Sequence, residues 1–172
     1  MLGDTYTYGI GQGYLTSTPV QMAVAAAALA NGGDVLEPRV VHGFRGDTNV
    51  EELPRTVRSH VPVDAANLEV VREAMRIAAS PGGTAFEGKP DGVAIGGKTG
   101  TAEFGTMRPD GSYDSHGWYM GFAPYDNPEI VLAVVIERAG TGASAAAPVV
   151  CQTFAAYFSY DAQRCGSQAE AN

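Results

Sequence analysis

Apolar residues gather first in an alanine-rich run, Met22–Ala30, which contains no charged side chain. A helix that is apolar all round is typical of a buried helix, because alanine lets neighbouring backbones approach closely. The preceding Thr18-Pro19-Val20-Gln21 predicts its start, since threonine can cap it, proline suits its first position and glutamine can reach back as in a capping box. Asn31-Gly32-Gly33 predicts its end. We expect residues 3–17, rich in glycine and threonine, to be extended or loop.

A second helix is predicted after Asp64, which can act as its N-cap. Apolar and charged residues there fall on two opposite faces at helical spacing. The two faces are expected to consist of Leu68, Val71, Met75 and Ala78 on the apolar side, and Glu69, Arg72, Glu73 and Arg76 on the polar side. Ser80-Pro81-Gly82-Gly83 ends this helix. Between the two helices, residues 35–62 contain short β-type pieces and polar turns, so we expect loops and small strands there.

The last third of the chain changes to strand periodicity. His116–Ala123 and Glu129–Glu137 are predicted strands, with Pro109-Asp110-Gly111 as a turn before them. The unbroken apolar stretch Ile130–Ile136 favours a strand that is covered on both faces. Pro148 then opens a helix with an apolar stripe.

These elements predict the fold class. Because the connections between the strands are short, we expect antiparallel neighbours with helices packed on the faces of the sheet, which is the α+β class. Residues 1–160 are expected to form one compact unit, and residues 161–172 a solvated tail.

The composition supports a folded domain and excludes some functions. The chain has 172 residues, of which 45% are hydrophobic and 17% charged. Its net charge of −8 and pI near 4.7 exclude a basic surface for nucleic acid. The two cysteines form no zinc motif. The plainer interpretation is a buried thiol at Cys151 and a tail thiol at Cys165, and a disulfide between them is the open alternative. The histidines are scattered, so we expect no metal ion and no cofactor.

One stretch matches a nucleotide-binding pattern by letter. Gly92–Thr99 fits G-x-x-x-x-G-K-T, a phosphate loop that requires a buried strand before it and a helix after it. The preceding Gly88-Lys89-Pro90-Asp91 predicts a turn, and the residues that follow are β-like. Gly9-Ile10-Gly11-Gln12-Gly13 likewise lacks the spacing and the acidic partner of a dinucleotide loop. We therefore disfavour nucleotide binding and interpret the second stretch as a glycine-rich approach to the buried helix.

Lys98-Thr99-Gly100-Thr101 has a different meaning if it lies on a strand. Side chains alternate between the faces of a strand, so Lys98 and Gly100 would share one face. Thr99 and Thr101 would share the other face or the rim of the strand, depending on the local twist. A cation, two hydroxyls and a glycine that permits close approach suit an anion such as a carboxylate. On an edge strand, the backbone amide of Thr101 could donate to a developing oxyanion. Alone, these residues do not outweigh the plainer interpretation of a solvent-exposed strand.

Several further motifs occur in order along the chain. They are Gly3-Asp4-Thr5-Tyr6, Gly9–Gly13, Thr18-Pro19-Val20-Gln21, Ala30-Asn31-Gly32-Gly33, Gly97–Glu103 and Gly117-Trp118-Tyr119-Met120-Gly121-Phe122-Ala123-Pro124. This series closely resembles the C-terminal half of the transpeptidase domain of class B penicillin-binding proteins, in particular the penicillin-binding protein 2 type. The resemblance implies a partial serine β-lactamase and penicillin-binding transpeptidase fold. It also implies part of a peptidoglycan D,D-transpeptidase, which cross-links stem peptides through a serine acyl-enzyme and binds penicillin.

The resemblance also assigns roles to residues. The Lys-Thr-Gly signature of the family falls on Lys98, Thr99 and Gly100, and Lys98 is expected to supply positive potential and to hydrogen-bond the active-site serine. The hydroxyls of Thr99 and Thr101 are expected to hold the terminal carboxylate of a stem peptide or β-lactam. The Thr101 amide is expected to be an oxyanion donor, and Glu103 to line the cleft. The implied catalytic residues are therefore Lys98 and Thr101, with Thr99, Gly100, Thr101 and Glu103 binding substrate.

The sequence departs from the family in its nucleophile. The family also requires Ser-x-x-Lys and Ser-x-Asn. No serine of this chain has lysine three positions later or asparagine two positions later. We therefore predict that this polypeptide alone neither reacts with β-lactams nor transfers peptides. The alternative is a non-catalytic module that binds or senses β-lactams or peptidoglycan.

The resemblance implies partners as well. In the family fold, an upstream half supplies a strand that pairs with the strand at Ile130–Ile136. Without it, that strand has an unpaired edge, which invites a homodimer or an upstream half on a second chain. The implied parent protein lies at the cell envelope, on the extracytoplasmic face of the cytoplasmic membrane, and is held there by an N-terminal anchor that is missing here.

Overall fold

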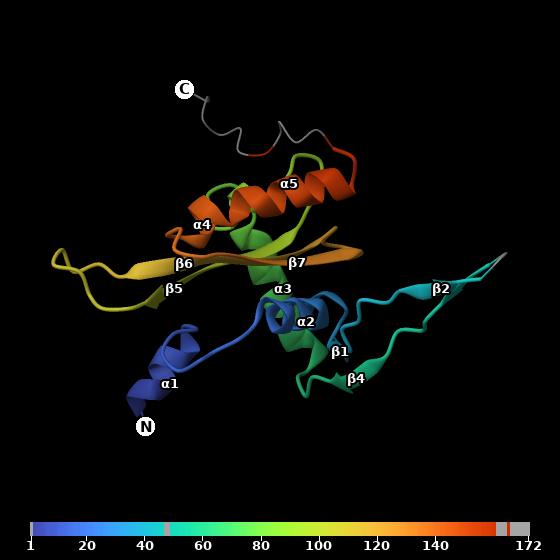
Figure 1. Cartoon of the computed structure of the whole chain (residues 1–172), viewed down its shortest axis with the longest axis horizontal. Coiled ribbons are helices and arrows are strands. Elements are labelled where there is room, and N and C mark those ends of the chain that lie inside the picture. Colours follow the sequence, from blue (N-terminus) through green and yellow to red (C-terminus); the bar gives the residue numbers. More distant parts are fainter. Residues whose placement is uncertain (1, 47–48, 161–164, 166–172) are drawn as a thin grey trace.

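An antiparallel sheet lies at the centre of the molecule, with its strands in the order β5–β6–β7 (Figure 1). The computed structural model describes residues 2–46, 49–160 and 165. Within them, the sheet consists of β5 (Gly96–Phe104), β6 (Asp114–Ala123) and β7 (Ile130–Ile136). Helices cover both faces, so the predicted α+β class and antiparallel pairing are confirmed.

The face of the sheet under α4 (Gly142–Ala145) and α5 (Ala147–Tyr157) carries the larger core cluster. Val150 and Phe154 are fully buried there, which confirms the stripe predicted after Pro148. The hydroxyl of Tyr119 donates to the carbonyl of Ala85 at 2.8 Å, next to the 3-10 turn η1 (Phe86–Gly88). Burial raises the pKa of this tyrosine above its usual range.

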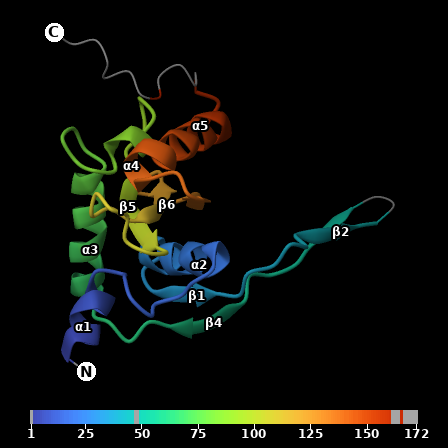
Figure 2. The ribbon, with the colours of Figure 1, turned by 60° about the vertical axis from the view of Figure 1, so that its left-hand side comes forward.

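The opposite face packs on α2 (Pro19–Ala30) and α3 (Ala65–Ala78), as Figure 2 shows from a second side. The capping box of α2 is confirmed, because the Thr18 amide donates to Gln21 Oε1 at 2.8 Å and the Gln21 amide donates to Thr18 Oγ1 at 3.3 Å. The helix ends before Asn31, as predicted, and its C-terminal half is buried at Ala26, Ala28 and Ala30.

The predicted faces of α3 are correct in part. Leu68 and Met75 are buried as expected, and Asp64 occupies the N-cap position, although its side chain makes no capping hydrogen bond. Val71, assigned to the apolar face, is 44% exposed. Arg72, assigned to the polar face, has a side chain that is only 12% exposed.

The Arg72 side chain points towards the sheet, where carbonyl oxygens accept its hydrogen bonds and aromatic rings lie next to its guanidinium. Its guanidinium donates to the carbonyls of Leu29 at 3.1 Å and Ala30 at 2.6 Å, where the end of α2 leaves backbone acceptors without helical partners. It also donates to the carbonyl of Tyr125 at 2.9 Å and lies 5.1 Å from the centre of the Phe122 ring. A long charged side chain thereby joins α2, α3 and the turn after β6.

The expectation that residues 3–17 are extended or loop was wrong for the first part of that segment. Leu2–Gly9 forms helix α1. Asp4 lies in its first turn, where a negative charge stabilises the helix through its interaction with the helix dipole. Thr7 Oγ1 donates back to the carbonyl of Gly3 at 2.7 Å, so the threonine that suggested an extended chain is satisfied within the helix. The loop prediction holds for the residues between α1 and α2.

Short strands fill the region between α2 and α3, as predicted. β1 (Asp34–Leu36) pairs with β4 (Val57–His60), and β2 (Gly43–Arg45) pairs with β3 (Val50–Glu52), each pair antiparallel. The β2–β3 ribbon projects away from the sheet in both views (Figures 1 and 2). The strand β7, expected to be covered on both faces, is half-buried along its whole length because it lies at the edge of the described sheet.

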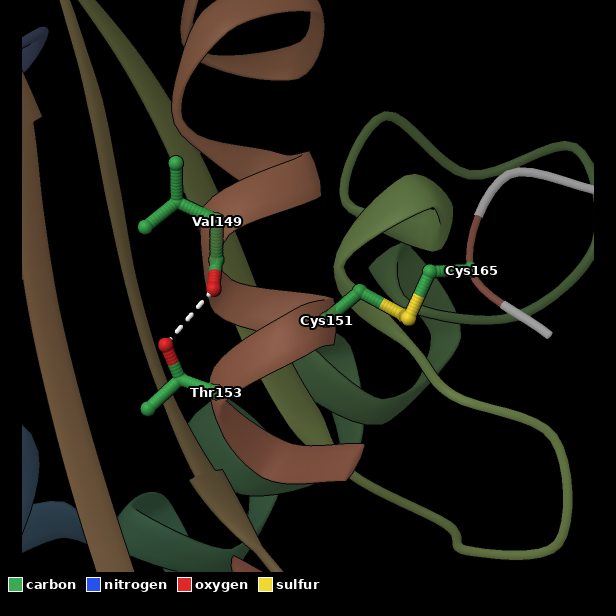
Figure 3. Close-up of a disulfide and its surroundings, with 4 residues drawn as sticks. All are labelled: Val149, Cys151, Thr153 and Cys165. Carbon is green, nitrogen blue, oxygen red and sulfur yellow. Dashed lines mark hydrogen bonds between the residues drawn. A yellow bond between two sulfur atoms is a disulfide. The ribbon is translucent and has the colours of Figure 1, made fainter. Parts of the chain in front are cut away.

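The two cysteines form a disulfide, which contradicts their interpretation as free thiols (Figure 3). Cys151 is fully buried on α5, and its Cα lies 5.7 Å from that of Cys165, which is within the usual range for a bridge. The rest of the tail predicted over 161–172 lies outside the described residues. In the part of the chain that is described, no helix combines the length and apolar character needed to cross a membrane.

Candidate functional site

The Lys98–Thr101 tetrad lies on the edge strand β5. β5 pairs with β6 along one side, and no strand of the described residues lies along its other side. The phosphate-loop pattern that ends at Thr99 therefore runs into a strand rather than into a helix, which removes the geometry that a phosphate loop requires. The second pattern, Gly9–Gly13, follows helix α1 rather than a strand, so a dinucleotide loop is excluded as well.

The register with β6 places the side chains of the tetrad on two faces. Gly96 pairs with Phe122 and Lys98 with Met120, and both partners belong to the cluster that faces α2 and α3. Thr99 pairs with Tyr119, which faces α5. Opposite residues of a ladder share a face, so the predicted alternation is confirmed, with Lys98 and Gly100 on one face and Thr99 and Thr101 on the other.

Two side-chain contacts show which way the backbone groups of β5 point. Lys98 Nζ donates to the carbonyl of Thr99, and Gln12 Nε2 donates to the carbonyl of Thr101 at 2.7 Å. These carbonyls therefore face the free edge rather than β6. The N–H and C=O of one residue in an antiparallel strand point to the same side, so the Thr101 amide also faces the free edge. The strand thus presents a donor and an acceptor at Thr101 along the same free edge on which the ammonium of Lys98 reaches the Thr99 carbonyl.

Glycines allow other backbone segments to press directly against the tetrad. A Cβ atom on Gly142, at the start of α4, would lie 1.9 Å from the carbonyl oxygen of Trp118 and 2.6 Å from that of Gly100. A Cβ atom on Gly117, opposite Thr101, would lie 2.7 Å from the carbonyl oxygen of Thr141. All three distances are too short for a real Cβ atom, so α4 and the residue before it pack backbone against backbone on β5 and β6.

The remaining site candidates differ in exposure. Lys98, Thr101 and Glu103 are exposed, whereas Thr99 and Gly100 are half-buried. Glu103 follows on the same face as Thr101 by strand alternation, further along towards the β5–β6 turn. The structure therefore brings all five predicted residues onto one strand. In the described ranges, no group of His, Cys, Asp or Glu side chains could hold a metal ion.

The turn predicted at Pro109-Asp110-Gly111 lies between β5 and β6, as expected. The Ser112 amide and hydroxyl both donate to the carboxylate of Asp110, at 3.0 and 2.7 Å. These bonds, the hydroxyl first, hold the pKa of Asp110 below its usual value. The hairpin closes further with the Arg108 amide, which donates to the carbonyl of Ser112 at 2.8 Å.

Gln12 is the site neighbour that the sequence interpretation missed. It lies in the Gly9–Gly13 stretch, which was treated only as an approach to the buried helix, yet its side chain contacts the tetrad. A primary amide placed between two glycines was the available signal.

A separate cavity of about 260 Å³ lies between the end of α2 and the start of α3, and none of its lining residues belongs to β5.

Comparison with known proteins agrees with this geometry. Residues 1–155 match the penicillin binding protein transpeptidase domain family. The peptidoglycan D,D-transpeptidase MrdA of Haemophilus influenzae is 33% identical over 159 residues, which are 86% of this chain and 24% of that protein. This chain therefore spans well under two thirds of the length of that relative.

Solved structures show the same fold. Penicillin-binding protein A of M. tuberculosis, in an imipenem acyl-enzyme complex, matches with a TM-score of 0.70 and 31% identity over 88% of this chain and 33% of that chain. Pseudomonas aeruginosa PBP2 in complex with WCK 5153 matches with a TM-score of 0.66 and 30% identity over 100% of this chain and 36% of that chain. The chain therefore belongs to the penicillin-binding protein transpeptidase family, among the class B proteins of penicillin-binding protein 2 type.

Proposed function

We propose that this chain supplies the carboxylate-binding and oxyanion-binding strand of a peptidoglycan D,D-transpeptidase. The observation that carries the proposal is the free edge of β5, to which both the backbone groups of Thr101 and the ammonium of Lys98 are directed. Lys98 supplies positive potential to the reacting serine. The hydroxyls of Thr101 and Thr99 hold the terminal carboxylate of the peptide, with Gly100 between them and Glu103 lining the cleft.

The Thr101 amide acts on the transition state. When a serine oxygen attacks the carbonyl of the penultimate D-alanine, a C–O bond forms and the carbonyl oxygen becomes an oxyanion, which this N–H can bind. Loss of one such donor typically raises the barrier by about 2.7–4 kcal/mol. The C–N bond then breaks, and the terminal D-alanine leaves as an amine that takes up the proton lost by the serine hydroxyl. The amine of a neighbouring stem peptide next forms a C–N bond to the acyl group, the ester C–O bond breaks, and the proton of that amine returns to the serine oxygen.

The nucleophile comes from outside this chain, which has no Ser-x-x-Lys. We propose that residues 1–160 form the C-terminal part of the transpeptidase domain and residues 161–172 a tail. The end of α5 at Tyr157 supports this division. The partner that completes the site is the upstream half of the domain, which would pair with the free edge of β7. A second copy of this chain is the competing occupant of that edge.

We place the parent protein in the cell envelope, on the extracytoplasmic face of the cytoplasmic membrane. The Cys151–Cys165 disulfide supports this assignment, because disulfides form and persist mainly in oxidising compartments outside the cytosol.

Labelled penicillin tests the proposed function. The purified chain is expected to remain unlabelled, and covalent label on it would refute the assignment of the nucleophile to another segment. When it is mixed with a polypeptide that carries the upstream Ser-x-x-Lys half, we expect label on the upstream serine. Lys98→Ala should abolish that labelling, whereas Lys89→Ala, which changes the other lysine of the sequence, should not. Equal labelling with both variants would refute the role of Lys98.

The missing nucleophile also favours a second candidate, a module that binds β-lactams or stem peptides without turnover. The same mixture separates the two. A sensor would bind labelled penicillin reversibly and release it on denaturation, whereas a transpeptidase part would leave the label on the upstream serine through a covalent bond.

A further inference from the structure

The loop after α1 reaches the free edge of β5 through the side chain of Gln12. Gly11 and Gly13, on either side of it, have φ angles of +74° and +78°, in the left-handed region that favours glycine. The Gln12 amide donates to the carbonyl of Thr7 at 3.0 Å, which anchors this residue to the end of α1. Gln12 is half-buried, although both flanking glycines are exposed.

The group that Gln12 contacts is one that a peptide substrate would need. Its Nε2 donates to the carbonyl of Thr101 at 2.7 Å. An extended peptide that adds to the free edge of a strand forms backbone hydrogen bonds with the outward N–H and C=O groups of that strand. The N–H of a primary amide is chemically equivalent to a peptide N–H as a donor. Gln12 thus occupies the carbonyl that the backbone of an acyl-donor peptide would use.

We propose that Gln12 acts as a placeholder at the free edge of β5, meaning that its side-chain amide takes the place of a substrate N–H on the Thr101 carbonyl. An incoming D-alanyl peptide must displace this side chain before the peptide can align along the strand. This inference rests on the proposed function and adds to it a residue that regulates access to the site. Displacement exchanges one amide donor for another, so the edge strand keeps its acceptor satisfied whether or not peptide is present. The glycines at 11 and 13 provide the backbone freedom that lets the loop withdraw.

The test is a titration of the ¹⁵N-labelled 172-residue chain with an N-acylated peptide that ends in D-Ala-D-Ala, followed by NMR. The wild-type chain is compared with Gln12→Ala and with Gln12→Met, which keeps the length of the side chain but cannot donate. Loss of one competing hydrogen bond should tighten binding by about 2- to 10-fold in both variants, with the Thr101 amide among the resonances that shift. Ile10→Ala is the matched control, because Ile10 lies on the same loop and is 76% exposed.

Each outcome decides the inference. Tighter binding by both Gln12 variants, with Ile10→Ala unchanged, supports the placeholder. Equal or weaker binding by the Gln12 variants overturns it, and weaker binding would mean that Gln12 braces the strand for the peptide, while the proposed function stands. If none of the proteins binds the peptide, the placeholder is overturned, because the edge of β5 in this chain then takes up no peptide for Gln12 to compete with. The proposed function, which needs the upstream half, is decided separately by the labelled-penicillin experiment.

Discussion

Arg72 provides the sharpest test of how the helical layer is held to the sheet. We consider the replacement Arg72→Met, because methionine keeps most of the apolar stem and removes only the charge and the donors. In the folded protein, the guanidinium donates hydrogen bonds to the carbonyls of Leu29, Ala30 and Tyr125, at 3.1, 2.6 and 2.9 Å. All of these acceptors lose their donor together.

The expected loss follows from those contacts. A hydrogen bond to a charged group contributes about 1.5–3 kcal/mol to stability. The three bonds share one guanidinium, so their contributions to stability are not additive. We therefore expect Arg72→Met to lower the free energy of unfolding by about 3 kcal/mol. For a chain of this size, such a loss lowers Tm by about 6–12 °C.

Urea denaturation followed by circular dichroism measures the effect, with Arg76→Met as the matched control. Arg76 lies one turn later on α3, and its side chain is 42% exposed. Its ion pair is with Glu73 on the same helix, and its guanidinium lies 5.9 Å from the centre of the Tyr125 ring without a hydrogen bond to a backbone carbonyl of the described residues, so its replacement should cost much less. The slope of the transition should be the same for both variants, because neither changes the surface exposed on unfolding. If both variants unfold at the same urea concentration, the reasoning about the buried guanidinium is refuted.

Two further predictions concern the support of the site and the response to acid. Gly142→Ala should lower the free energy of unfolding by at least about 2 kcal/mol, because the new Cβ would overlap the carbonyl oxygen of Trp118. Gly9→Ala is the control, because a Cβ there would meet no atom within 4 Å and should leave the stability unchanged. Thermal denaturation measures both variants, and equal melting temperatures would contradict the prediction. The pKa of Glu73 is lowered from 4.5, first by its hydrogen bond from Arg76, so its contribution is present above pH 4.5 and is lost as the pH falls through the lowered pKa. Urea midpoints measured from neutral pH down to about pH 3 should therefore fall less steeply for Glu73→Gln than for the wild type, and parallel curves would contradict the prediction.

Local chemistry explains why parts of the fold could be predicted from the sequence. The start of α2 depends on Thr18 and Gln21, which are three positions apart and satisfy each other. The two faces of β5 follow from strand alternation, which the sequence carries residue by residue. The fold class and the placement of Lys98 and Thr101 on a strand were therefore accessible without coordinates.

The features that escaped prediction depend on residues that are distant in the sequence. Gln12 and Thr101 are 89 positions apart, and nothing near Gln12 indicates that its partner is a backbone carbonyl. Arg72 resembles a solvated residue of α3 until the end of α2 and the Tyr125 turn supply acceptors for it. Helix α1 escaped because glycine, threonine and tyrosine have weak intrinsic helix preference, whereas the contacts of a folded chain can override it.

The disulfide between Cys151 on α5 and Cys165 closes a covalent ring that runs along the chain from one cysteine to the other. Within that ring, hydrolysis of any single peptide bond separates no fragment from the rest, because both new ends remain joined through sulfur. A protease that nicks the chain between Tyr160 and Cys165 would therefore leave the outermost segment attached to α5 until a reductant opens the ring. In an oxidising surrounding, the C-terminal end can thus lose its continuity along the backbone and still stay connected to the domain.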